Sequence, residues 1–180
     1  VYFVAPNYRI TELQSAVGLA QLGKLKRIVS KRHRLGERLT AGLKGIPGII
    51  PHKVPRGGYA TYWFYLIGLD VERLGVDART FGKALNAEGI AGSGSFYMRP
   101  VYLEYSYLRQ RTAFHHSRYP FTLARKAIKY REGLCPNAER IGQAVYYFPL
   151  NEWLTNREID DTIAAVRKVA EHYGRQRGTR

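Results

Sequence analysis

The chain has 180 residues, of which 45% are apolar and 13% aromatic, so it can form a packed domain, and this composition argues against extended disorder. The longest nearly apolar run, residues 59–69, is about half as long as a membrane-spanning helix, and no secretory signal pattern opens the chain. Twenty-nine basic and 14 acidic residues give a net charge of +15, so a role in binding a polyanion stays open.

The first predicted element is a long helix. Thr11 and Gln14 fit the capping-box pattern, which predicts a helix start near residue 11. Apolar side chains then recur on one helical face, at Leu25, Ile28, Leu35, Leu39 and Leu43. Glycine and proline residues between positions 45 and 48 are typical of a helix end, so the helix is expected to run to about residue 43.

Strands and short helices are predicted to follow. Residues 49–54 form a short apolar stretch, and residues 62–67 are an unbroken aromatic and β-branched run that predicts a strand. Asp77 is expected to cap a helix that Gly89 ends. Residues 90–97 are then expected to be extended.

In the last third of the chain, the sequence patterns predict secondary structure more clearly near the C-terminal end than near residues 103–130. A helical turn is predicted near residues 103–108, and the mixed residues 112–130 are expected to form loop with local helix. A short helix at 137–144 and a strand at 145–149 come next. A second capping box, Thr155 to Glu158, predicts the final helix, and residues 174–180 are expected to be a frayed basic tail. This order of elements is typical of an α+β layer fold.

The sequence offers few groups for catalysis or metal binding. Cys135 is the only cysteine, which excludes an internal disulfide and favours a reducing, cytoplasmic setting. The adjacent His115 and His116 would point in different directions, which disfavours a metal site. The glycine-rich residues 89–94 follow a helix rather than a strand, so neither a dinucleotide-binding loop nor a P-loop fits.

Two basic or polar features have alternative interpretations. Asn7 and Arg9 precede the first helix, whose free N–H groups favour an anion, so they could form a phosphate site or simply a surface loop. The basic face that carries Lys24, Arg27 and Lys31 could bind nucleic acid, be solvated, or pack on an acidic partner.

Several segments resemble one enzyme family. They are NYRITELQSAVGLAQL at residues 7–22, the aromatic strand at 62–69, Gly89-Ile90 followed by Pro100-Val101-Tyr102, CPNAER at 135–140, and Phe148-Pro149-Leu150. These segments are similar, in the same order, to the DegT/DnrJ/EryC1/StrS aminotransferases, pyridoxal-phosphate enzymes that mostly aminate keto-sugars.

The resemblance implies that the chain is the C-terminal part of a fold type I transferase that works as a homodimer with shared active sites. Residues 1–10 would end the large cofactor-binding domain, 11–44 would form the interdomain helix, 45–173 the small α/β domain, and 174–180 the tail. The lysine that links to the cofactor is expected upstream, so the chain alone is expected to be inactive. Neither a membrane nor nucleic acid is an expected partner.

The resemblance also suggests roles for individual residues. Asn7 would reach the phosphate of the cofactor held by the partner subunit, and Arg9, Tyr97, Arg99 and Tyr102 would bind substrate. The stretch SFYMRPVY at residues 95–102 departs from the pattern of members that use nucleotide-linked sugars. The segments at residues 119–121 and 135–136 are similar to members that act on cyclitols or other carbocyclic ketones. Glutamate or glutamine would be the amino donor. A catalytically silent family member and a polyanion-binding module remain the alternatives.

Overall fold

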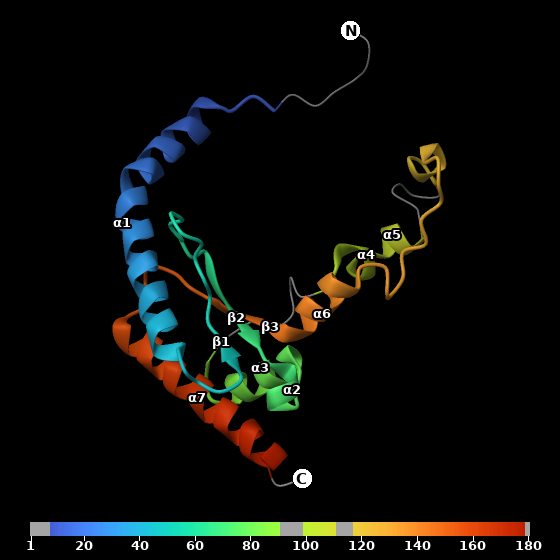
Figure 1. Cartoon of the computed structure of the whole chain (residues 1–180). Helices are drawn as coiled ribbons and strands as arrows, with labels where there is room; N and C mark the ends of the chain where they lie inside the picture. The colour runs from blue at the N-terminus through green and yellow to red at the C-terminus, as the bar shows by residue number, and fades with distance from the viewer. Residues whose placement is uncertain (1–7, 91–98, 111–116, 179–180) are drawn as a thin grey trace.

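The computed structural model describes residues 8–90, 99–110 and 117–178. Its longest element is α1 (Glu12–Leu43), which curves along one side of the molecule (Figure 1). The predicted capping box is confirmed: the Gln14 N–H donates to Thr11 Oγ1 at 3.2 Å, and the Thr11 N–H donates to Gln14 Oε1 at 2.9 Å. The sequence therefore predicted the start and end of this helix correctly.

The described strands form one small antiparallel sheet in the order β1 (Ile49–Ile50), β2 (Phe64–Leu69) and β3 (Val145–Pro149). The strand predicted at 145–149 is confirmed. The strand predicted at 62–67 begins later, at Phe64, and runs to Leu69. Its start is displaced because Tyr62 has a φ of 47°, a left-handed conformation that no strand contains.

The remaining helices are short except for the last. They are α2 (Val71–Leu74), α3 (Ala78–Ala87), α4 (Val101–Glu104), α5 (Ser106–Gln110), the 3₁₀ turn η1 (Phe121–Leu123), α6 (Pro136–Ala144) and α7 (Asn156–Gly178). The caps predicted for α3 are confirmed, since Asp77 accepts a hydrogen bond from the Thr80 N–H and Gly89 has a φ of +82°. Most of the strand predicted at 90–97 lies outside the described residues.

The tail predicted to fray from residue 174 is instead helical as far as Gly178, so that prediction is wrong. Gly174 does not end α7, which continues through this glycine. A basic side chain near the end of the helix, such as Arg175, interacts favourably with the negative end of the helix dipole.

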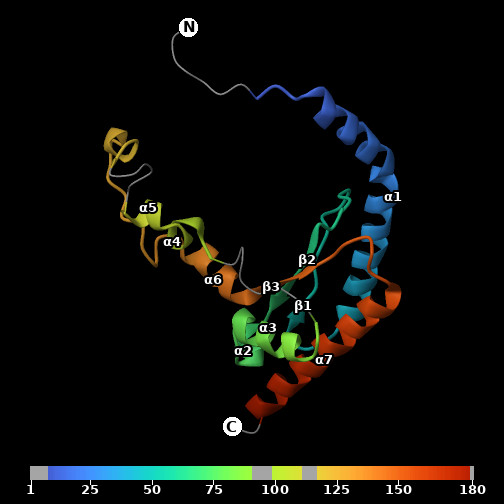
Figure 2. The ribbon, with the colours of Figure 1, turned by 180° about the vertical axis from the view of Figure 1, so that it is seen from behind.

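The hydrophobic core lies between one face of the sheet, the C-terminal half of α1, and α7. Its largest fully buried side chains are Tyr65, Tyr146, Phe81, Leu39, Leu43, Ile67, Leu74, Leu85 and Val166. Because helices and a small antiparallel sheet share this core, the predicted α+β class is confirmed. Figure 2 shows the same arrangement from behind.

The N-terminal half of α1 extends beyond this core (Figure 1). Leu25 belongs to the predicted apolar face of the helix but is 51% exposed, because the sheet and α7 reach only the part of α1 from about residue 28 onward. The residues from Leu13 to Gly23 include no charged side chain, yet Leu13, Leu19 and Leu22 are each more than 60% exposed. A helix that is apolar around its circumference is typically buried in a larger assembly.

Candidate substrate-binding groove

The face of the sheet that points away from the core forms the floor of a groove. Phe64 and Leu66 on β2, and Val145 and Tyr147 on β3, alternate with the buried residues of their strands and line this groove. The first residues of α4 and one side of α6 form its walls. Its volume is about 480 Å³, which is within the range of small-molecule sites.

Arg99 is the charged side chain among the described residues that line the groove. It directly precedes α4, and none of the ion pairs formed by the described residues includes it. An apolar groove with one cationic group fits a ligand that combines an apolar face with an anionic group.

A polar cluster joins the two walls. The Tyr102 hydroxyl on α4 donates a hydrogen bond to the carboxylate of Glu139 on α6, and the Cys135 N–H donates to that hydroxyl oxygen at 3.1 Å. The Glu139 carboxylate also accepts from the Gly133 N–H, at 2.9 Å to each oxygen, and from the Cys135 N–H at 3.4 Å. We call these four residues the Tyr102–Glu139 clamp.

The electrostatics of the clamp favour a neutral phenol beside a charged carboxylate. Partial desolvation and the hydrogen bond to Glu139 raise the pKa of Tyr102 to about 12. The hydrogen bonds from Tyr102 and the Gly133 N–H lower the pKa of Glu139. At neutral pH the hydroxyl of Tyr102 is therefore protonated and donates its hydrogen bond to Glu139.

The structure brings together only some of the site residues predicted from the sequence. Arg99 and Tyr102 lie three residues apart at the start of α4, whereas Arg9 precedes α1 and is exposed. The start of α1 and α4 lie on opposite sides of the molecule (Figures 1 and 2). Asn7 and Tyr97 lie outside the described residues.

The start of α1 is the other candidate phosphate site. The N–H of Gln14 is already bonded to Thr11, and Glu12 adds a negative charge to the first turn. The helix end itself is therefore poorly suited to an anion. Among the described residues near it, Arg9 is the cationic group that could hold a phosphate.

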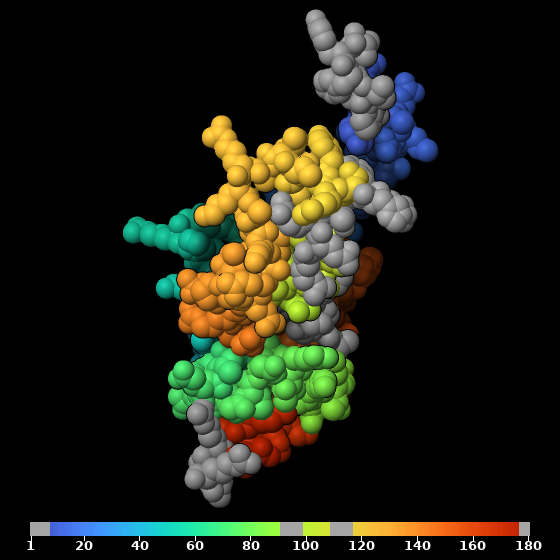
Figure 3. All heavy atoms as spheres, turned by 90° about the vertical axis from the view of Figure 1, so that its right-hand side faces the viewer, coloured from blue at the N-terminus to red at the C-terminus, as the bar shows by residue number. Residues whose placement is uncertain are grey.

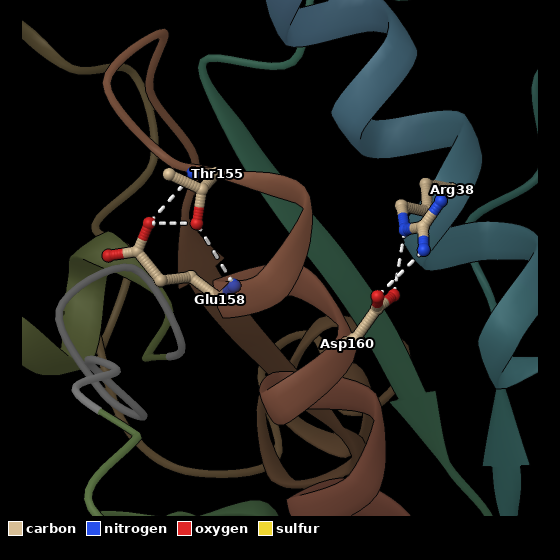
Figure 4. Close-up of polar contacts among 4 residues, drawn as sticks. All are labelled: Arg38, Thr155, Glu158 and Asp160. Carbon is tan, nitrogen blue, oxygen red and sulfur yellow. Dashed lines mark hydrogen bonds and ion pairs between the residues drawn. The ribbon is translucent and has the colours of Figure 1, made fainter.

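Two basic side chains of α1 pair with carboxylates in and just ahead of α7. Arg38 donates two 2.7 Å hydrogen bonds to Asp160 (Figure 4), and Arg32 pairs with Glu152 at 2.6 Å. The hydrogen bonds from Thr155, with a smaller contribution from the charge of Lys31, lower the pKa of Glu158. Arg38 of the predicted basic face is thus paired within the chain, and packing of this face on an acidic partner stays a prediction.

Other candidate sites are weaker. A second hollow of about 540 Å³ between α3 and α7 contains Lys168, but that side chain is paired with Glu88 at 2.6 Å. The described residues include no cluster of three or more potential metal-ligating side chains, and His115 and His116 lie outside them. No helix in the described part of the chain has the length and apolar character to cross a membrane.

The profile of the DegT/DnrJ/EryC1/StrS aminotransferase family matches residues 2–167. The chain belongs to this family. It is 26% identical over 169 residues to the spore coat polysaccharide biosynthesis protein SpsC of Bacillus subtilis, covering 93% of the chain and 39% of SpsC. It is 32% identical over 111 residues to the GDP-perosamine synthase of Vibrio cholerae, covering 62% of the chain and 30% of that enzyme.

Solved structures of family members share the fold. The aminotransferase PseC of Helicobacter pylori, involved in the biosynthesis of pseudoaminic acid, superposes with a TM-score of 0.68 at 21% identity over 96% of the chain and 40% of PseC. The chain thus spans about two fifths of the length of this structure and of SpsC.

The family motif at residues 135–140 contains the residue that sequence reasoning missed. The motif pointed to the family but gave no role to Glu139, whose position in the first turn of α6 was the available signal. Its partner Tyr102 is 37 residues away, and only the folded chain brings the two together.

Proposed function

We propose that the chain is the C-terminal portion of a pyridoxal-phosphate-dependent aminotransferase. The complete protein transfers an amino group from an amino acid, glutamate or glutamine, to a keto-sugar or a related cyclic ketone. The observation that carries this proposal is the family match over residues 2–167, together with a fold shared over nearly the whole chain.

The cofactor and this chain have separate tasks in the proposal. Pyridoxal phosphate, when bound, supplies the electron sink for exchange of the amino group. Asn7 and Arg9 hold its phosphate or the substrate, and Arg99 and Tyr97 bind and orient the substrate. Tyr102, predicted as a further substrate-binding residue, instead supports the wall of the groove through its hydrogen bonds to Glu139 and Cys135. The lysine that anchors the cofactor belongs to the large domain, which precedes residue 10 in this assignment.

The separation of the start of α1 from α4 supports a shared active site. These two elements lie on opposite sides of the molecule (Figure 1), so in a homodimer they can serve different active sites. The exposed apolar half of α1 supports the same arrangement, because it needs a covering surface from the large domain or a second subunit.

The groove supports a cyclic substrate. Its apolar floor suits the face of a sugar or cyclitol ring, and Arg99 can pair with a negatively charged substituent. A nucleotide-linked keto-sugar and a keto-cyclitol both remain candidate substrates, and the experiment distinguishes them.

The test uses the complete protein reconstituted with pyridoxal phosphate. We expect L-glutamate to convert the cofactor spectrum to the pyridoxamine form, and one ketone from a panel of nucleotide-linked keto-sugars and keto-cyclitols to yield an amine detected by mass spectrometry. The isolated 180-residue chain should show no active-site-like cofactor absorbance. Absence of glutamate-dependent amination by the complete protein would contradict the proposal and leave a catalytically silent family member.

A further inference from the structure

The part of the chain between α4 and α6 has no core of its own. Among the described residues from 104 to 144, none is buried, although this segment includes α5, η1 and α6. Figure 3 shows the segment, coloured yellow to orange, as a layer above α2 and α3 in green. Hydrophobic burial therefore contributes little to its position, and polar contacts at its base become important.

The Tyr102–Glu139 clamp closes this base. The segment leaves the body after Tyr102 and returns at Cys135, and these residues meet through the 3.1 Å hydrogen bond between the Cys135 N–H and the Tyr102 hydroxyl. Glu139 joins both ends, because its carboxylate accepts from Tyr102 on one side and from the Gly133 and Cys135 N–H groups on the other.

The clamp also connects the two walls of the groove. Arg99 and Val101 belong to the wall that Tyr102 anchors, while Ala138 and Ile141 belong to the wall that contains Glu139. Val101 and Ile141 are each more than half exposed, so burial of these side chains contributes little to holding the two walls together. The hydrogen bonds to the charged carboxylate contribute more, since hydrogen bonds to an ionised acceptor are about twice as strong as neutral ones.

We propose that Glu139 is a positioning residue for substrate binding: through Tyr102 it holds α4 against α6 and so places Arg99 at the groove. Glu139 does not touch the substrate. This inference rests on the proposed function, in which Arg99 binds the substrate, and adds to it the residue that holds Arg99 in place.

Glutamine is the informative replacement. A carboxylate presents two acceptor oxygens to the Tyr102 O–H and the two N–H groups, whereas a carboxamide presents one acceptor and one NH₂ donor. In Glu139→Gln the carboxamide NH₂ group therefore faces at least one of these O–H or N–H donors, and that hydrogen bond is lost. Glu132→Gln is the matched control, because Glu132 is an exposed carboxylate of the same segment for which no hydrogen bond is found among the described residues.

The first measurement is independent of activity. Hydrogen exchange on the complete protein should show faster deuterium uptake in residues 99–105 and 131–135 of Glu139→Gln, and unchanged uptake in Glu132→Gln. Tyr102→Phe, which keeps the carboxylate and its N–H partners, should accelerate exchange mainly in residues 99–105. Unchanged exchange in both clamp variants would overturn the clamp itself.

The second measurement is a double-mutant cycle on the ketone that the complete protein aminates. Glu139→Gln should raise KM for the ketone roughly 10- to 100-fold, as expected for a displaced binding group, with kcat changed less than about twofold. In the Arg99→Ala background the same substitution should change KM less than about twofold. An undiminished effect in that background would overturn the role assigned to Glu139. If no ketone is aminated, the proposed function fails, while the exchange data still decide whether the clamp exists.

Discussion

Gly36 of α1 lies directly against the ring of Tyr62: a Cβ atom added at position 36 would stand 2.4 Å from Cδ2 of the tyrosine. The tyrosine is almost fully buried, and its hydroxyl donates a 2.7 Å hydrogen bond to Glu37. The close approach of α1 to the start of β2 therefore depends on the absence of a side chain at this position.

Alanine at Gly36 should accordingly destabilise the chain by about 1–3 kcal/mol, because the methyl group overpacks the contact with Tyr62. Gly18 is the matched control, since it is also helical but has no atom within 4 Å of an added Cβ. Gly18→Ala should stabilise by about 0.5–1 kcal/mol through helix propensity. Urea unfolding of both variants measures the effects, and changes of the same sign would contradict this account.

Tyr65 and Tyr146 form a second matched pair, because both rings are completely buried. The Tyr65 hydroxyl lies 2.7 Å from Thr40 Oγ1, whereas the Tyr146 hydroxyl has no hydrogen-bond partner among the described residues. Tyr65→Phe should cost about 1–2 kcal/mol, and Tyr146→Phe should be neutral or stabilising by up to about 1 kcal/mol. Thermal unfolding distinguishes the two, and equal losses would show that the hydroxyl of Tyr146 is satisfied in solution.

Acid should destabilise the contact between α1 and α7. The hydrogen bond from Arg38 lowers the pKa of Asp160, and the Thr155 N–H lowers the pKa of Glu158 (Figure 4). A carboxylate with a lowered folded-state pKa stabilises the fold above its ordinary value, here 3.8 and 4.5, and this stabilisation is lost as the pH falls through the folded-state value.

The melting temperature should therefore fall as the pH is lowered below about 4.5, and Asp160→Asn with Glu158→Gln should flatten this dependence. At neutral pH the Arg38→Ala change should lower the melting temperature by only about 1–3 °C, since the pair with Asp160 is half exposed. A double variant that retains the full acid sensitivity would exclude these two carboxylates as its source.

The basic face of α1 leads to a prediction about salt. Arg38 is already paired with Asp160 of α7, and Arg32 with Glu152 just ahead of that helix, so we expect only weak, sequence-independent nucleic-acid binding that disappears at physiological ionic strength. Fluorescence anisotropy with single- and double-stranded oligonucleotides measures this. Tight binding at physiological salt that is abolished by reversing Lys24, Arg27 and Lys31 would instead establish the polyanion-binding alternative.

The elements that the sequence predicted correctly are those specified by neighbouring residues. The capping boxes at Thr11 and Thr155 and the cap at Asp77 depend on contacts three residues apart, which a linear pattern contains. The strand at 145–149 was recognisable because its run of aromatic and β-branched residues is local too.

The features that the sequence could not predict depend on contacts between residues that are far apart in the chain. The exposure of Leu25 follows from how far the sheet and α7 extend along α1, which no helical period encodes. The left-handed Tyr62 is held by packing on Gly36, which lies 26 residues earlier. The clamp likewise needs α4 and α6 to meet, so Tyr102 was predicted only as a residue of the substrate pocket.

The length of α1 has a mechanical consequence. Its 32 residues span about 48 Å, and its first fully buried side chain is Leu35, about 35 Å from the beginning of the helix. Rotation of α1 about its contact with α7 would therefore displace the N-terminal end of the helix. A tilt of about 5° at this contact would move that end by about 3 Å, roughly the length of a hydrogen bond. In the proposed function Arg9 helps to hold a phosphate or the substrate, so substitutions that loosen α7 should weaken that binding although they lie at the other end of α1.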